Sequence, residues 1–241
     1  MYAQANARAG QAEAIDEGLR AYMLRIYNLM ALGVAITGIA ALGTVMLAVQ
    51  NGQLTAFGQA IYASPLQWVI MLAPLAVVFI FSARIHAMSA GTAQAVFFGF
   101  AALMGMSLSS IFLVFTGESI VQVFFITAAA FGALSLWGYT TKRDISGWGS
   151  FLFMGLIGII IASIVNIFLQ SSMMGFVVSV IGVLVFAGLT AWDTQRLKNM
   201  YYQFAGDSAV LGQIAISGAL SLYLNFINLF IMLLQLFGNR E

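Results

Sequence analysis

The sequence contains no cysteine and only one histidine, His86. Without cysteine, the chain can form neither a disulfide nor a thiolate metal site. A single histidine excludes a zinc site built from several histidines. We therefore expect no resident metal or other cofactor, and His86 itself is best interpreted as a solvated or hydrogen-bonded loop residue, with a proton switch as the alternative.

Charged residues are also scarce. They make up 7% of the 241 residues, against 62% hydrophobic residues, whereas soluble domains carry roughly 25% charged residues. This deficit of charge indicates a protein embedded in the lipid bilayer. The bilayer is therefore its first expected partner. The formal net charge of +1 argues against nucleic acid, whose binding depends on a strongly basic surface. The N-terminal residues contain Glu13, Asp16 and Glu17 and do not read as a signal peptide.

Runs without charge mark the membrane spans. The longest runs, Ile26–Ala83 and Ile145–Trp192, can each hold two helices of about 20 residues. Each is interrupted near its middle by a polar break, QNGQ at 50–53 and LQSSMMG at 169–175. The sequence thus predicts an all-α integral membrane protein, a bundle of seven helices near 27–49, 66–88, 91–115, 119–140, 149–169, 174–198 and 211–237. Six spans plus a re-entrant segment is the alternative.

Lysine and arginine predict the orientation. With the N-terminus inside, the outer segments hold only Arg240, and the inner segments hold Arg8, Arg20, Arg25, Arg84, Lys142, Arg143, Arg196 and Lys198. The positive-inside rule then predicts a cytoplasmic N-terminal segment, residues 1–25, and a transmembrane domain, residues 26–239, with the C-terminus outside. Residues 10–25 form either an amphipathic surface helix or a frayed tail before the first span.

A polar stripe follows the last predicted span: Ser217, Ser221, Asn225, Asn228 and Gln235. Their spacing places them on one side of a helix. Amides in lipid need hydrogen-bond partners, so the stripe should face inward and the seventh helix should lie at the centre of the bundle. Interhelical packing without a further role is the alternative interpretation of these residues.

Asp193 ends an apolar segment near the inner end of the sixth span. A carboxylate at membrane depth is costly, roughly 2.5–3.5 kcal/mol at the midplane. Arg84 ends the second span at the same level, and we expect the two to pair across the bundle; separate snorkelling to the headgroups is the alternative. Glu118, between the third and fourth spans, either caps a helix N-terminus or marks an outer mouth for cations.

Catalytic patterns are missing. An intramembrane aspartyl protease needs two carboxylates that share a site, and the nearest string, FAGD at 204–207, lies in a polar loop. Serine catalysis needs a paired histidine base, and no G-x-S-x-G string accompanies His86. We therefore expect a protein that is not an enzyme.

Three long stretches resemble the Bax inhibitor-1 family, also called the transmembrane Bax inhibitor motif family: LWGYTTKRDISGWGSFLFMGLIGIIIASIVNIFLQS at 136–171, AWDTQRL at 191–197 and LSLYLNFINLFIMLLQLFG at 220–238. The resemblance implies seven membrane helices with the last surrounded by the other six. It also implies a pH-sensitive calcium leak, closed by two aspartates that share a proton beside an arginine of the second helix. Asp193 matches the first aspartate, and Arg84 is the candidate for the arginine.

The second aspartate of that pattern is absent. The family commonly has LYLDF, whereas this chain reads LYLNF, with Asn225 at the aspartate position. Related members also often carry arginine where Gln235 stands. Two neighbouring carboxylates can share a proton, but a carboxylate and an amide leave a single titrating group. This chain therefore lacks the proton-sharing pair on which the implied pH-sensitive leak depends.

The function expected from these residues is a multi-pass protein of the bacterial inner membrane that leaks calcium or modulates cation permeation. Its gate would comprise Asp193, Arg84 and Asn225, with calcium as transported ion rather than cofactor. The alternative is a regulator of membrane-protein quality control or proteolysis, which acts through contacts with a membrane protease or other membrane proteins. Asn225 separates the two, because it weakens only the channel interpretation.

Overall fold

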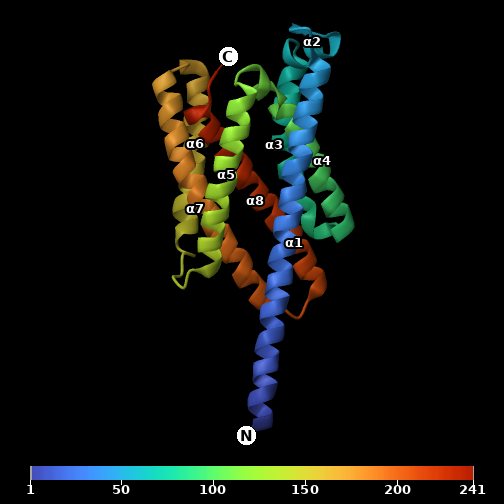
Figure 1. Ribbon diagram of the computed structural model, residues 1–241, viewed down its shortest axis with the longest axis vertical. Coiled ribbons are helices and arrows are strands. Elements are labelled where there is room, and N and C mark those ends of the chain that lie inside the picture. Colours follow the sequence, from blue (N-terminus) through green and yellow to red (C-terminus); the bar gives the residue numbers. More distant parts are fainter. Residues whose placement is uncertain (1, 241) are drawn as a thin grey trace.

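Long helices make up almost the whole chain in the computed structural model, which describes residues 2–240 (Figure 1). By length and composition, seven of them can cross a membrane, as the sequence predicts. They are α1 (Tyr2–Ala48), α3 (Leu66–Arg84), α4 (Ala90–Leu108), α5 (Gly117–Thr140), α6 (Trp148–Leu169), α7 (Ser172–Phe204) and α8 (Ser208–Phe237). The 3₁₀ turn η2 (Ser109–Leu113) extends α4, and η1 (Ile85–Ala87) follows α3.

Helix α1 begins well before the predicted start of the first span. Its apolar part runs over Ile15–Ala48, and Leu19, Tyr22 and Met23 are buried. Residues 15–25 therefore form neither a separate surface helix nor a frayed tail, because they continue the first long helix and pack into the bundle. At 1.5 Å per residue, 47 residues extend about 70 Å, and Figure 1 shows the N-terminal part of α1 projecting beyond the other helices.

Short turn structures occupy the polar breaks. The QNGQ break is a hairpin, β1 (Val49–Gln50) paired antiparallel with β2 (Gln53–Leu54), followed by the short helix α2 (Ala56–Tyr62). Asn51 and Gly52 have φ values of 51° and 74°, which the tight turn of a two-residue hairpin requires. In the second break, Gln170 ends α6 in the left-handed region, and the Ser171 side chain accepts a hydrogen bond that caps α7.

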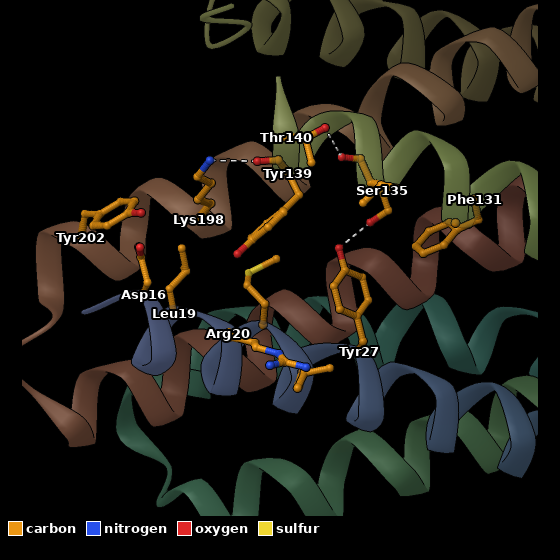
Figure 2. Close-up of a pocket in the computed structure, with 14 residues that line it drawn as sticks. Asp16, Leu19, Arg20, Tyr27, Phe131, Ser135, Tyr139, Thr140, Lys198 and Tyr202 are labelled. Carbon is orange, nitrogen blue, oxygen red and sulfur yellow. Dashed lines mark hydrogen bonds between the residues drawn. The ribbon is translucent and has the colours of Figure 1, made fainter. Parts of the chain in front are cut away.

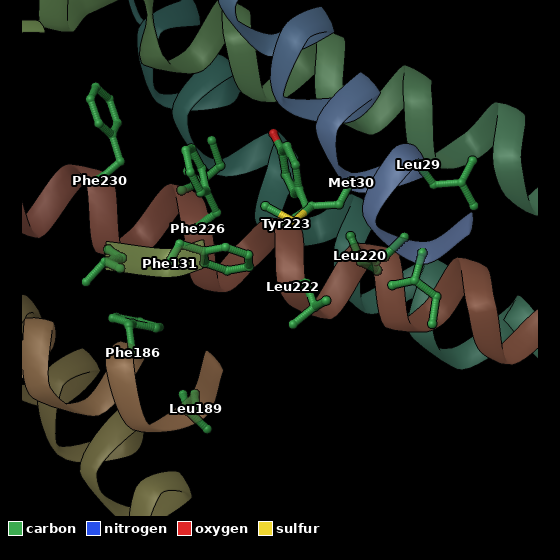
Figure 3. Close-up of a cluster of buried hydrophobic side chains, with 14 of the residues drawn as sticks. Leu29, Met30, Phe131, Phe186, Leu189, Leu220, Leu222, Tyr223, Phe226 and Phe230 are labelled. Atoms are coloured by element: carbon green, nitrogen blue, oxygen red, sulfur yellow. The ribbon is translucent and has the colours of Figure 1, made fainter. Parts of the chain in front are cut away.

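Helix α8 packs against α1, α4, α5 and α7. It runs obliquely between α5, α6 and α7 on one side and α1, α3 and α4 on the other (Figure 1). Of the seven spans it buries the largest share of its apolar window, 56%. Its aromatic residues join the core shown in Figure 3, where the rings of Phe226 and Phe131 lie 5.5 Å apart. The fully enclosed position that the sequence suggests for α8 stays a prediction.

Glycines allow two close helix approaches. A Cβ atom on Gly138 of α5 would lie 2.3 Å from the Ala191 carbonyl oxygen of α7, and one on Gly218 of α8 would lie 2.5 Å from the Leu197 side chain. Real Cβ atoms do not come this close. The neighbour of Gly138 is backbone, so α7 meets α5 at a distance that only glycine permits, whereas at Gly218 the Leu197 side chain would have to shift. Both contacts fall on the stretch Ala191–Leu197.

A tether joins the end of α8 to the start of α5. The backbone N–H of Thr116 donates to the Asn239 carbonyl oxygen at 3.0 Å, and the Asn239 N–H donates to Ser119 Oγ at 2.9 Å. The Arg240 guanidinium lies 5.7 Å from the centre of the Phe115 ring. The residues after α8 are thus fixed to the loop before α5.

Candidate functional site

The stretch Ala191–Leu197 lies where α7 meets several other helices. Helix α7 packs against α5, α6 and α8, and consecutive residues of a helix point in different directions. The side chains of this stretch therefore reach several neighbours. The Trp192 ring nitrogen donates to the Ser146 carbonyl oxygen before α6 at 3.2 Å, while Asp193 faces α8. This one stretch thereby connects α7 to its surroundings.

Asp193 is a buried carboxylate bonded to α8. The residue is 3% exposed. Its Oδ2 accepts hydrogen bonds from Asn225 Nδ2 at 2.8 Å and from Ser221 Oγ at 3.0 Å. Ser221 and Asn225 are one helical turn apart on α8, so both can reach the same oxygen. Hydrogen bonds to a charged acceptor are shorter and stronger than neutral ones, and they bind α7 to α8 at this point.

Arg196 supplies the countercharge. Its Nη2 lies 2.8 Å from Asp193 Oδ1, at the i, i+3 spacing of one helix. Within the described residues, neither Asp193 Oδ1 nor Arg196 Nε has an aligned hydrogen-bond partner. The contact is therefore an ion pair rather than a bidentate hydrogen bond. The guanidinium also lies 4.7 Å from the centre of the Trp192 ring, and its side chain is 39% exposed, so Arg196 joins the buried acid to the surface.

The expected pairing of Asp193 with Arg84 is not the one in the structure. Arg84 is the last residue of α3 and is exposed, while the ion pair of Asp193 is made by Arg196. The physical reason is proximity, because residues three apart on a helix are neighbours whatever the bundle does. Arg84 stands at an end of a helix, where its side chain can reach the polar surface.

Hydroxyl groups link α7 to α5 and α1 beside this carboxylate. Ser135 Oγ of α5 lies 2.9 Å from Thr194 Oγ1 and 2.5 Å from Tyr27 Oη of α1. Thr194 also donates to the Thr190 carbonyl oxygen of its own helix. This network was not among the residues expected from the sequence, since isolated serine, threonine and tyrosine residues carry no signal of which helix faces they share.

Gln195 fixes the loop between α5 and α6. Its Oε1 accepts from the Ile145 N–H at 2.9 Å, and its Nε2 donates to the Arg143 carbonyl oxygen at 2.8 Å. Both ends of the amide are therefore used by backbone. Gln195 thus has a structural role in this stretch that no sequence pattern indicated.

The polar stripe of α8 divides into parts. Ser221 and Asn225 face Asp193 as described, and Ser217 is exposed. Asn228 donates to the Leu224 carbonyl oxygen of its own helix at 2.8 Å. Gln235 Oε1 lies 2.7 Å from Ser179 Oγ of α7. Two of the five stripe residues therefore belong to the Asp193 site, and one more contributes to the same α7–α8 contact farther along.

Glu118 lies apart from this site. It is exposed in the first turn of α5, where the Thr116 side chain accepts a hydrogen bond from the Ser119 N–H and caps the helix. A carboxylate in the first turn interacts favourably with the helix dipole, which fits the capping interpretation. The His86 side chain lies outside the described residues.

The carboxylate of Asp193 has a defined chemical capacity. One oxygen holds two neutral donors and the other faces a cation, so both are engaged by protein groups. Among the described residues, no group of three or more histidine, cysteine, aspartate or glutamate residues could hold a metal ion. A cation that reaches Asp193 must therefore exchange places with Ser221, Asn225 or Arg196 rather than enter a ready set of ligands.

Comparisons with known proteins show similarity over almost the whole chain. The sequence model of the family described as "Inhibitor of apoptosis-promoting Bax1" matches residues 19–241. Inner membrane protein YbhL of Escherichia coli K12 is 47% identical over 230 residues, covering 93% of this chain and 94% of its own. A protein of Rickettsia prowazekii is 48% identical over 232 residues, covering 94% and 92%. A membrane protein of Streptococcus pyogenes is 36% identical over 237 residues, covering 94% and 96%.

Proposed function

This chain belongs to the Bax inhibitor-1 family, and from that premise we propose that it is an inner-membrane protein through which cations, calcium foremost, leak under the control of Asp193. The proposed orientation has the N-terminus in the cytoplasm and the C-terminus in the periplasm, because the basic residues gather on one side. The observation that carries the proposal is the buried carboxylate held by donors of α8 and by Arg196.

In this proposal the gate is closed by the bonds around Asp193. Ser221 and Asn225 hold α8 against α7, and Arg196 neutralises the carboxylate. Opening would exchange these donors for a hydrated cation, so the carboxylate would serve as latch and transient ligand in turn. In the proposed gate Arg196 is the cation beside Asp193, where Arg84 was expected, and Asn225 is a neutral donor. Glu118 stays a candidate for the outer mouth.

The neutral amide predicts a flat pH response. The gate contains one carboxylate, so it lacks the pair that could share a proton. We expect calcium flux into liposomes carrying the purified wild-type protein to be weak or constant across a pH series around neutrality. Asn225→Asp should create or steepen a pH dependence, because two acids would then compete for one arginine.

Asn225→Gln is the matched control, since it keeps an amide at the same position and should leave the response flat. A steep pH response in wild type that Asn225→Asp leaves unchanged would mean that another group is the sensor, with His86 the first to test. A flux in wild type equal to that of empty liposomes at every pH would remove the leak itself.

The second candidate function is regulation of membrane-protein quality control or proteolysis through protein contacts. Asn225 favours this function, because its hydrogen bond to Asp193 joins α8 to α7 without forming a pair of carboxylates that could share a proton. On this view Asp193→Asn would lower stability while flux stays at the background of empty liposomes. Cross-linking in native membranes, followed by identification of a protease subunit that is absent with Asp193→Asn, would support it.

A further inference from the structure

A crevice of about 830 Å³ opens between α1, α5 and α7 (Figure 2). Asp193 is not among its lining residues, but Tyr27 and Ser135 of the hydroxyl network are. The two ends of the crevice differ in character. Asp16, Lys198 and Tyr202 lie toward one end and Phe131 lies at the other, with Arg20 between them. Its volume falls within the range of roughly 300–1,000 Å³ that is typical of ligand sites.

The polar part of the crevice carries a surplus of positive charge among the described residues. Arg20 and Lys198 line the crevice, against one acid, Asp16. Lys198 Nζ donates to the Tyr139 carbonyl oxygen at 2.8 Å and lies 5.1 Å from the centre of the Tyr139 ring. An ammonium group has three donors, and within the described part of the chain only one of them is used, so two can serve a ligand. Arg20 is exposed at the mouth. This part of the crevice is therefore unfavourable for a cation and favourable for an anion.

The remaining walls are apolar and open sideways. Leu19 and Met23 are buried and form the inner wall. Leu24 and Leu136 form the lips and are 50% and 63% exposed. Gly132 also lines the crevice, and a Cβ atom added to it would meet no atom within 4 Å. In a membrane-spanning bundle, exposed leucines on the spans face acyl chains, so the crevice opens toward lipid.

We propose that this crevice binds a phospholipid with an anionic headgroup. The headgroup phosphate lies against Lys198 and Arg20, and one acyl chain passes over Gly132 between Leu24 and Leu136. A free phosphate would satisfy the basic residues but leave the apolar opening without a partner. A cation pathway would meet two positive charges at its mouth. The inference goes beyond the proposed leak and does not depend on it.

The test measures lipid retention by native mass spectrometry of the purified protein, titrated with phosphatidylglycerol or with phosphatidylcholine. The double variant Arg20→Gln/Lys198→Gln removes the charge, and Gly132→Leu fills the acyl path. The matched controls are Lys142→Gln, an exposed lysine outside the crevice, and Gly43→Leu, whose Cβ also meets no atom within 4 Å. Inorganic phosphate is added as a competitor.

We expect wild type to retain one phosphatidylglycerol in preference to phosphatidylcholine. Each basic residue near a membrane surface contributes roughly fivefold to the attraction, so the double variant should lose about 25-fold, and Gly132→Leu should also lose retention. Both controls should behave as wild type. Equal retention of the two lipids would overturn the proposed site and indicate general attraction to the protein surface. A loss in Lys142→Gln as large as that in the double variant would mean the same. If inorganic phosphate displaces phosphatidylglycerol and Gly132→Leu retains the lipid as wild type does, the crevice binds a free anion and the lipid proposal is wrong.

Discussion

Replacing Arg196 should cost far more stability than replacing Arg84. Arg196→Gln removes the cation that lies 2.8 Å from Asp193 Oδ1 and leaves a buried carboxylate with neutral donors only. Arg84→Gln is the matched control, because it makes the same chemical change at an exposed helix end. The pair of variants decides which arginine compensates the buried acid.

The size of the loss follows from the exposure of the two partners. Breaking a fully buried ion pair costs roughly 3–5 kcal/mol, and an exposed pair is worth about 0–1 kcal/mol. The Asp193 side chain is 5% exposed and that of Arg196 is 39% exposed, so solvent screens one partner only. We therefore expect Arg196→Gln to lower the free energy of unfolding by about 2 kcal/mol, between these limits, and Arg84→Gln by under about 0.5 kcal/mol.

The assay is reversible unfolding in detergent micelles, followed by tryptophan fluorescence. A double-mutant cycle with Asp193→Asn isolates the coupling, which should be about 1–2 kcal/mol for contacting charges. The double variant Asp193→Asn/Arg196→Gln should then recover part of the loss of Arg196→Gln. If Arg84→Gln costs as much as Arg196→Gln, or if the cycle gives no coupling, the ion pair contributes nothing and the reasoning fails.

Three further predictions concern packing, hydrogen bonding and topology. Gly138→Ala should lower the free energy of unfolding by about 1–3 kcal/mol, because its Cβ would lie 2.3 Å from the Ala191 carbonyl oxygen. The control Gly132→Ala should not lower it. Equal effects of the two substitutions would contradict the close approach of α5 to α7. Asn225→Ala should cost about 1.5–3 kcal/mol, because a buried charged hydrogen bond is lost, whereas Asn228→Ala, which bonds its own helix, should cost less than half of that in the same unfolding assay. A reporter fused after the last residue should report from the periplasm, and a cytoplasmic signal would reverse the proposed orientation.

The seven spans were predictable because lipid imposes a simple rule. Backbone groups in the bilayer must be bonded within helices, so long charge-free runs had to be helical. The same reliance on charge-free runs placed the start of the first span too late. Asp16, Glu17, Arg20 and Arg25 interrupt the apolar run, so the span was expected to begin after them. All four are exposed, while Leu19 and the residues at helical spacing from it are buried. The charges lie on one face of a helix whose other face continues into the core.

The candidate site was predicted only in part. Asp193 and its two partners on α8 could be proposed because a carboxylate and a polar stripe stand out in an apolar chain. The choice between Arg84 and Arg196 depended on distance, and only the i, i+3 spacing pointed to Arg196. The contact of Thr194 with Ser135 and Tyr27 could not be predicted, because it depends on which faces of three helices meet.

The ion pair between Asp193 and Arg196 also bears on how the protein enters the membrane. Because both charges belong to α7, they can neutralise each other while this helix leaves the translocon, where a single aspartate or arginine at the helix centre costs about 2.5–3.5 kcal/mol. The donors from α8 arrive only when the next segment has been synthesised. Helix α7 thus carries the counterion of Asp193, Arg196, while it is inserted. Ser221 and Asn225 of α8 add their hydrogen bonds afterwards. The buried acid therefore acquires its partners in the order in which they are synthesised.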